Sequence, residues 1–356
     1  MQMSIDIRPF KLSDVYGQPS VVKELTKRFK DNNIPKAILL KGQYGCGKTT
    51  ISKIIAMTLN CEHVDTKGEP CGKCSVCKDI MNETFSQDTR VLDGGATGKE
   101  GVIEFGQMAQ MSPMYNKNSV YIIEEADQLS PAAKNSLLKL LEKPQDNVYF
   151  ILLSMVNTGI PAALQSRCQV YKFNPFSTTD IMLALKGTLE KIGKWGNPSI
   201  PMSFYTEGLR TIGESSNGSL RTAIQLLDKC VSGDFFSTEE ISEHLGIISP
   251  STVHGMLMDA LELKKVFFDK LETVDIQEFF NLGYTLISDA LAYRITKEAK
   301  REYFEAQTRA MAETRYLVEV ANIFDEVMQT TYIRKQFIES KFAQMYISKR
   351  MRIVEE

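Results

Sequence analysis

The sequence predicts an α/β fold in which a five-stranded parallel sheet lies between helices and is followed by an entirely helical region. Three observations predict this fold. A glycine-rich loop, Gly42 to Thr50, separates a strand-like run from a helix-like run. Four further apolar runs follow, with helix-like segments between most of them, and strand patterns stop after Asn174. Strands that alternate with helices after such a loop are typical of an α/β sandwich.

The glycine-rich loop matches the G-x-x-x-x-G-K-T pattern of a phosphate-binding loop. It follows the apolar run Ala37 to Leu40 and opens the helix-like run Ile51 to Leu59, which is the context the pattern needs. Glycines let backbone N–H groups turn toward phosphates, Lys48 reaches the terminal phosphates, and the Thr49 hydroxyl holds Mg²⁺. The loop residues that we expect to bind ATP and Mg²⁺ are Gly42, Gly45, Cys46, Gly47, Lys48, Thr49 and Thr50.

The remaining strands are expected at four runs with the composition of buried parallel strands. A helix begins after Ser130-Pro131, a capping hydroxyl followed by proline, and ends before Lys143-Pro144. A nucleotide on such a sheet binds at the carboxyl ends of the strands. The four runs are Thr89 to Asp93, Val120 to Ile123, Val148 to Leu153 and Gln169 to Phe173.

Two carboxylates follow the predicted strand that ends at Ile123. An ATPase places its metal contact and its water-orienting base at the end of a buried strand. We therefore expect Glu124 to hold Mg²⁺, directly or through water, and Glu125 to orient the attacking water. The alternative is an ordinary exposed acidic turn, which the accompanying phosphate loop makes the less favoured interpretation.

Four of the seven cysteines form a C-x9-C-x2-C-x2-C pattern after the helix of the phosphate loop. In a chain without a secretion signal, this spacing indicates a structural zinc site rather than disulfides. Four thiolates complete a tetrahedron and leave no position for a catalytic water. Reduced surface cysteines are the alternative. The expected zinc ligands are Cys61, Cys71, Cys74 and Cys77.

The composition is that of an ordinary globular protein, with 43% hydrophobic and 24% charged residues. The segment from Met1 to Phe10 lacks the apolar core of a signal peptide, and no apolar run is long enough to span a membrane. We therefore expect a cytoplasmic protein with no membrane partner, in a bacterial cell or, if phage-encoded, in the host. The net charge of −2 requires any DNA contact to use a local basic surface.

These motifs resemble the AAA+ ATPase subunits of sliding-clamp loaders, above all the bacterial DNA polymerase III gamma/tau type, with replication factor C a more distant relative. The resemblance covers residues 5–247 strongly and the rest weakly. The cysteine insertion is its most discriminating feature. Besides the motifs above, it is carried by Arg8-Pro9, Asp14 to Gln18, Glu142-Lys143-Pro144, Ser166-Arg167-Cys168 and Gly218 to Arg221.

The resemblance implies roles for further residues. Val15 and Tyr16 would pack on the adenine, and Arg221 would be the lid's sensor arginine on the phosphates. Arg167 would be an arginine finger that acts in trans on the nucleotide of a neighbouring subunit, where a guanidinium stabilises transition-state charge. The catalytic set would then be Lys48, Glu125 and Arg167.

The resemblance also implies partners: other clamp-loader subunits in a pentamer, a ring-shaped sliding clamp, and primer–template DNA. No long extension follows the predicted helical end, so contact with DNA polymerase is expected to be indirect. Lys99, after a Gly-rich turn, is a candidate DNA phosphate contact, with a solvated lysine as the alternative. A methionine-rich stretch, which is either a clamp-docking surface or core, comprises Met108, Met111, Met114 and Tyr115.

The expected domains are an AAA+ ATP-binding domain at 1–174 with a zinc module at 61–77, a helical lid at 175–247, and a helical collar for oligomerisation at 248–356. Two departures from the family bear on the rate of hydrolysis: Glu124 replaces the usual Asp, and Met155 falls where the family has a polar sensor residue. Because Lys48, Thr49, Glu125 and Arg167 are all present, we expect an active ATPase. One alternative is a structural subunit that binds ATP without hydrolysing it. Another AAA+ DNA motor, a branch-migration helicase or an initiator, is the second, and the cysteine insertion argues against it.

Overall fold

The computed structural model describes residues 8–84, 88–97, 99–155, 159–238, 240–241, 250–272, 274–297, 305–328 and 340–345. The chain divides into two compact units. The first comprises Met1–Ser199 and Ser216–Asp228, and the second comprises Ile200–Ser215 and Lys229–Glu356. These two units have other boundaries than the three domains expected from the sequence, and that division stays a prediction.

The first unit contains the expected five-stranded parallel sheet, so the predicted fold class is confirmed. Its strand order is β2-β3-β4-β1-β5, and Leu39 at its centre lies beside Leu152 on one neighbouring strand and Val170 on the other. Because the strands are parallel, all carboxyl ends lie along one edge and all amino ends along the opposite edge. The strands are β1 (Ala37–Lys41), β2 (Thr89–Asp93), β3 (Ser119–Glu124), β4 (Val148–Ser154) and β5 (Gln169–Lys172).

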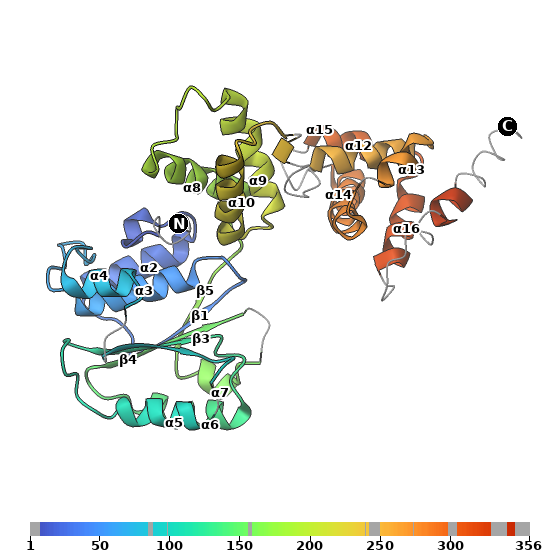
Figure 1. Ribbon diagram of the computed structural model, residues 1–356. Helices are drawn as coiled ribbons and strands as arrows, with labels where there is room; N and C mark the ends of the chain where they lie inside the picture. The colour runs from blue at the N-terminus through green and yellow to red at the C-terminus, as the bar shows by residue number, and fades with distance from the viewer. Residues whose placement is uncertain are drawn as a thin grey trace, which may run out of the picture. The chain divides into compact units, whose positions relative to one another are not determined.

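Helices cover both faces of this sheet (Figure 1). The short helix η1 (Leu12–Asp14) precedes α2 (Pro19–Lys30), and α2 shares one face with α3 (Lys48–Asn60) and α4 (Ser75–Met81). The other face carries α5 (Lys99–Met108), α6 (Pro131–Glu142) and α7 (Ala162–Gln165).

Local sequence signals and packing both fix α6 and its neighbours. The Ser130 hydroxyl accepts the N–H of Ala133 at 3.2 Å, so the predicted helix cap is confirmed. Tyr121 of β3 packs edge-on against Phe105 of α5, with ring centroids 4.6 Å apart, and stacks on Phe150 of β4 at 5.5 Å. The first contact joins α5 to the sheet, and the second joins two neighbouring strands.

The remaining helices continue the chain after β5. They are α8 (Thr178–Lys191), the π-helix η2 (Phe204–Gly208), α9 (Leu209–Ser215), α10 (Leu220–Gly233), α12 (Pro250–Leu261), α13 (Val266–Leu271), α14 (Ile276–Thr296), α15 (Glu305–Ala312) and α16 (Leu317–Met328).

The second unit has its own core, in which aromatic rings predominate. Phe267, Phe279, Phe280, Phe324 and Phe342 are fully buried and contact one another, with Phe280 and Phe324 closest at 4.4 Å between ring centroids. All residues of this core come from the helical part of the chain between Val253 and Met345. In the described part of the chain, no helix combines the length and apolarity that a membrane crossing requires.

Candidate nucleotide site

The glycine-rich loop has the backbone that a phosphate site needs. Gly45 and Gly47 adopt φ values of +74° and +97°, which other residues rarely adopt. At Gly42 an added Cβ would lie 2.5 Å from the Cys46 sulfur, so only glycine fits. Helix α3 begins at Lys48, and its first N–H groups have no partner within the helix, so they are available to an anion.

Lys48 is held inside this loop by backbone carbonyls. Its Nζ donates to the oxygens of Gly42 and Gln43, each at 2.7 Å. Burial lowers the pKa of Lys48, while the nearby Cys46 thiol and Asp127 carboxylate act in the opposite direction. A phosphate offers this ammonium a charged acceptor in place of two neutral ones, which makes a stronger hydrogen bond. Lys48 is therefore positioned to take up a phosphate.

The predicted acidic pair lies at the same edge of the sheet. Glu124 is the last residue of β3, and its carbonyl accepts the N–H of Gly94 at 2.8 Å. Glu125 follows with a φ of +48°, a left-handed conformation uncommon outside glycine, and its residue is exposed. A Cβ on Gly94 would approach the Glu125 carbonyl oxygen to 2.4 Å, so the turn after β2 packs directly on this backbone.

Strand β4 lies between β1 and β3, so its end lies between the phosphate loop and the acidic pair. Met155 occupies that end and is 39% exposed. Its N–H donates to the Asp127 carboxylate at 3.2 Å. A thioether offers no hydrogen-bond donor, so the Met155 side chain cannot sense a phosphate as a Thr or Asn does. The neighbouring Ser154 is buried and its hydroxyl donates to the Met155 carbonyl at 3.1 Å, and Asn157 lies outside the described residues.

The segment that carries Val15 and Tyr16 also reaches the phosphate loop. Gln18 donates through Nε2 to the carbonyl oxygens of Asn174 at 2.6 Å and of Cys46 at 3.4 Å. The Tyr16 hydroxyl contacts α8, where a Cβ added to Gly187 would lie 2.1 Å from it. Sequence reasoning did not identify Gln18 as a site residue, because its burial and its left-handed backbone are evident only in the structure.

The loop before α10 closes on the phosphate loop from another direction. The Leu220 N–H donates to the Gly45 carbonyl at 3.2 Å, and a Cβ on Gly45 would lie 2.1 Å from the Ser219 hydroxyl. The Arg221 guanidinium lies 5.2 Å from the centroid of the Tyr44 ring, within cation–π range. The predicted sensor arginine is therefore beside the loop. Tyr44 was missed, because the loop pattern accepts any residue at its position.

Arg167 lies at the opposite edge of the sheet. It comes just before Gln169, the first residue of β5, whereas the phosphate loop follows the last residue of β1. A five-residue strand separates its ends by roughly 13 Å, so Arg167 is remote from the phosphate loop of its own chain. Its guanidinium donates to the Glu142 carboxylate at 2.7 Å and to the Ala163 carbonyl at 2.8 Å.

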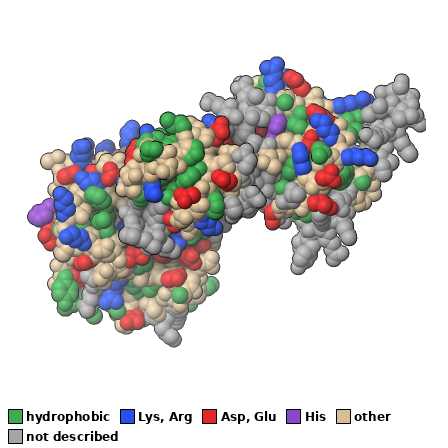
Figure 2. All heavy atoms as spheres, turned by 45° about the horizontal axis from the view of Figure 1, so that its top comes forward, with side chains coloured by type: hydrophobic (Ala, Val, Ile, Leu, Met, Phe, Trp, Pro, Cys, Tyr) green, Lys and Arg blue, Asp and Glu red, His purple; other side chains and the backbone are tan. Residues whose placement is uncertain are grey.

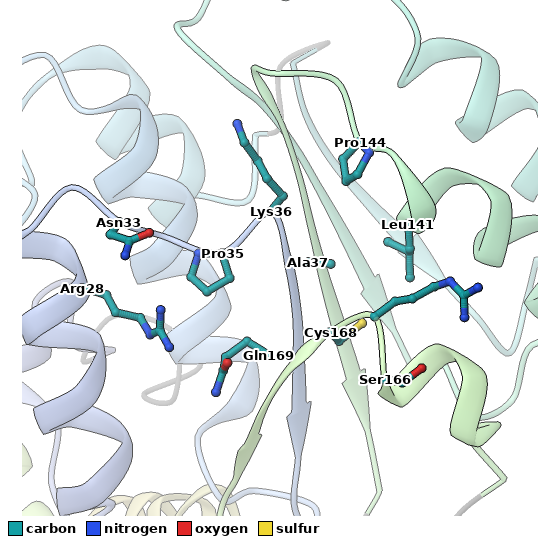
Figure 3. A pocket seen from close by; sticks show the side chains of 11 residues that line it. Arg28, Asn33, Pro35, Lys36, Ala37, Leu141, Pro144, Ser166, Cys168 and Gln169 are labelled. Atoms are coloured by element: carbon teal, nitrogen blue, oxygen red, sulfur yellow. The ribbon is translucent and has the colours of Figure 1, made fainter.

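A cavity of about 460 Å³ adjoins Arg167 (Figure 3). Arg28 and Asn33 enter it from the end of α2 and the turn after it, and Ser166 and Cys168 line it next to β5. Basic side chains contribute to its lining, but it lies at the amino edge of the sheet, away from Lys48. The structure thus brings Lys48, Glu124, Glu125 and Arg221 to one edge and separates them from Arg167.

The four predicted zinc ligands come together. All four sulfur atoms lie within 4.8 Å of one another. Tetrahedral zinc with Zn–S bonds of ~2.3 Å sets its sulfurs ~3.8 Å apart, so the donor set fits that metal. The Cys61 sulfur accepts the N–H of Cys71 at 3.2 Å, and the Cys71 sulfur accepts those of Lys73 and Cys74 at 3.3 Å. The N–H groups of Lys73 and Cys74 lower the pKa of the Cys71 thiol to about 6, which favours the thiolate that a metal binds.

Two of the other predicted contacts have different outcomes. Lys99 is the first residue of α5, but its side chain lies outside the described residues. Of the methionine-rich stretch, Met111, Met114 and Tyr115 are 64%, 70% and 73% exposed, so they are surface residues rather than core.

Comparisons with known proteins identify the family of this chain. The family "DNA polymerase III, delta subunit" matches residues 17–177. The DNA polymerase III subunit gamma of Buchnera aphidicola subsp. Schizaphis graminum is 33% identical over 260 residues, which cover 72% of this chain and 69% of that protein. The subunit tau of Bacillus subtilis is 32% identical over 270 residues and is matched over only 46% of its length.

Among solved structures, the Holliday junction branch migration motor RuvB of Thermotoga maritima aligns with 72% of this chain and 80% of its own. The sequence identity is 18% and the TM-score is 0.47, which is too low to carry an argument about function. The sequence match to the gamma subunit, over most of both chains, decides the assignment. The chain belongs to the DNA polymerase III gamma/tau family of AAA+ subunits.

Proposed function

We propose that this chain is an ATP-driven clamp-loader subunit, which opens a ring-shaped sliding clamp and loads it onto primer–template DNA. The observation that carries the proposal is the separation of Lys48 and Arg167 on opposite edges of one sheet. A chain built this way supplies a binding half to one nucleotide pocket and an arginine to the next. Such composite pockets couple ATP to the assembly state of a ring or spiral of subunits.

Each residue at the carboxyl edge has a proposed task. The phosphate loop and Lys48 bind the triphosphate, and Thr49 with Glu124 would hold Mg²⁺, which neutralises developing phosphate charge. Glu125 orients the attacking water, and its exposed side chain is accessible to it. Arg221 moves from the Tyr44 ring to the phosphates, where its charge has a stronger partner.

Arg167 is proposed to act on the nucleotide of a neighbouring subunit. In the assembly, the Arg167 guanidinium would leave the Glu142 carboxylate and pair with the γ-phosphate bound by a neighbouring subunit. Hydrolysis would then depend on assembly. An arginine finger contributes up to ~10³–10⁵ in rate. The neighbour is another copy or a related subunit, and the resemblance suggests a pentamer.

Zinc is proposed for the site formed by Cys61, Cys71, Cys74 and Cys77, on the strength of their sulfur spacing. With four thiolates the metal would be structural and would stabilise the fold of the segment that carries them.

Met114 and Tyr115 are proposed to contact the clamp, and Lys99 is proposed to contact DNA. The three N–H groups of residues 114–116 donate to the Asp88 carboxylate at 2.6–2.9 Å, which fixes Met114 and Tyr115 as an exposed apolar surface for a clamp. On the face drawn in Figure 2, basic and acidic side chains are interspersed. DNA phosphate would therefore be bound by a few residues per subunit, Lys99 among them, and by several subunits together.

A second candidate function is an ATP-binding subunit of the same assembly that does not hydrolyse ATP. Met155 favours it, because a thioether at the end of β4 provides no donor for the γ-phosphate. The intact loop and Glu125 oppose it.

Turnover of ATP with sliding clamp and primed DNA separates these two candidates. Under the clamp-loading proposal, the wild-type assembly hydrolyses ATP faster when clamp and DNA are added, and Glu125→Gln abolishes that stimulation while ATP binding persists. Glu124→Asp serves as the charge-conserving control and should retain activity. Unstimulated wild-type turnover identical to that of Glu125→Gln would establish the non-hydrolysing subunit instead.

A further inference from the structure

We refer to residues 61–77, which carry the four clustered cysteines, as the cysteine module. Residues 10–18 of the first unit connect this module to the phosphate loop, and we call them the strap. Its contact with the module centres on Glu69, which is only 5% exposed. One carboxylate oxygen accepts the Ser13 N–H at 2.8 Å and the other accepts the Ser13 hydroxyl at 3.0 Å. A buried carboxylate that lost both donors would be left unsatisfied, so this contact is costly to break.

Glu69 is itself fixed by the fold of the module. The Asp65 carboxylate accepts the N–H groups of Lys67 at 2.8 Å and of Glu69 at 2.9 Å, and the Asp65 N–H donates to the Glu69 carbonyl at 3.0 Å. This turn lies between Cys61 and Cys71, two of the four clustered cysteines. The turn also packs on α2 at Gly68, where an added Cβ would lie 2.8 Å from Phe29. The cysteine cluster and α2 together therefore fix the position of the Glu69 carboxylate.

A second contact lies on the other side of Cys71. The Phe10 ring packs on Gly72, where an added Cβ would lie 2.6 Å from the ring. Gly72 also adopts a φ of +68°, so both the close contact and the backbone conformation require glycine. The strap is thus attached to the module through Phe10 and Ser13. Their partners, Gly72 and Glu69, lie on either side of Cys71, a proposed metal ligand.

The other end of the strap is attached to the nucleotide site. Gln18 donates to the Cys46 carbonyl of the phosphate loop, and Tyr16 contacts α8 at Gly187. Four residues lie between Ser13 and Gln18, so the two are at most ~18 Å apart even when the chain is fully extended. The chain between them is folded, with Leu12–Asp14 in η1 and left-handed backbone at Gly17 and Gln18. We expect this compact segment to pass a shift of Ser13 on to Tyr16, three residues away.

We propose that Glu69 is a positioning residue for base recognition: by fixing Ser13 to the cysteine module, it holds Val15 and Tyr16 against the base of the bound nucleotide. The proposal rests on the proposed function, in which these two residues contact adenine. It adds that residues 61–77 influence affinity for the base, whereas the groups proposed to contact the phosphates, the phosphate loop and Arg221 among them, determine affinity for the triphosphate. Loss of the Glu69 contact should therefore weaken ATP binding and spare inorganic tripolyphosphate, which has no base.

The test measures the affinities of the full chain for ATP and for inorganic tripolyphosphate by competition with a fluorescent ATP analogue. Glu69→Ala should weaken ATP by about tenfold, the scale of one lost charged hydrogen-bond pair, and leave tripolyphosphate within about twofold. Glu69→Gln should restore most ATP affinity, because its amide can accept the Ser13 N–H and donate to the Ser13 hydroxyl. Glu62→Ala removes an exposed carboxylate of the same module and is the matched control.

Metal removal from the wild-type chain with a zinc chelator is the second arm, with the same two ligands as readout. A selective loss of ATP affinity supports the link to the cysteine cluster, and an unchanged ATP-to-tripolyphosphate ratio overturns that link. Equal weakening of both ligands in Glu69→Ala and Glu69→Gln would overturn the positioning role. A wild-type chain that binds tripolyphosphate but not ATP would refute the proposed function as well, whereas wild-type ATP binding with a normal ratio in Glu69→Ala would refute this proposal alone.

Discussion

The two edges of the sheet hold their cationic side chains in different ways. At the carboxyl edge, Lys48 donates to two backbone carbonyls, and the backbone cannot leave without unfolding the loop. At the amino edge, Arg167 is 32% exposed and pairs with Glu142, which is 56% exposed. Surface ion pairs of this kind contribute little free energy and exchange readily. One edge is therefore preformed for a ligand, and the other is poised to change partners.

The largest effect is expected at the preformed edge. Lys48→Ala removes the cation from the phosphate loop, so ATP affinity should fall by about a hundredfold or more and hydrolysis should be lost. Equilibrium binding of a fluorescent ATP analogue measures the affinity. Lys23→Ala, an exposed lysine on α2, is the control and should bind as wild type does. Wild-type affinity in Lys48→Ala would show that the loop does not bind phosphate.

The second effect is expected at the exchangeable edge. Arg167→Ala should leave ATP affinity unchanged and lower stimulated hydrolysis by at least about 10³-fold, because the arginine acts only in the assembled pocket. Parallel binding and turnover measurements separate the two quantities, with exposed Arg210→Ala as the control. A mixture of Lys48→Ala and Arg167→Ala chains should recover some activity if copies of this chain are neighbours. Weakened ATP binding by isolated Arg167→Ala chains would contradict an action in trans.

The smallest effect concerns the ion pair that holds Arg167. If Glu142 competes with a neighbour's phosphate, Glu142→Gln should raise stimulated hydrolysis by up to about fivefold, the scale of an exposed ion pair. The increase should shrink as salt is added, because salt already screens the pair. A salt series of turnover rates for both proteins measures this. A lower rate in Glu142→Gln at every salt concentration would mean that Glu142 instead holds Arg167 in its active orientation.

Sequence patterns predicted local features well. All five strands were found to within two residues at each end, since apolar runs and turn residues are local signals, and the Ser130 cap and the phosphate loop were identified for the same reason. The four cysteines are confirmed as a cluster, because short spacing leaves them few other arrangements.

Contacts between distant segments were not predictable in this way. Nothing local pairs Tyr44 with Arg221, or Glu142 with Arg167, because strand order and helix packing bring these residues together. Glu69 was passed over for the same reason, as its partner Ser13 is 56 residues away. The order of the strands depends on equally distant contacts, and local patterns did not predict it. The resemblance implied that Arg167 serves another subunit's nucleotide, but only the structure shows that it lies at the opposite edge of the sheet from Lys48 and that it pairs with Glu142.

Gly45 has a consequence for how a nucleotide enters. Its missing side chain is the space into which the Ser219 hydroxyl fits, so the loop and the segment before α10 touch only because this residue has no Cβ. An alanine at this position would act as a wedge between the two. The phosphate loop and the segment before α10 would then stay apart, and a bound nucleotide would dissociate faster.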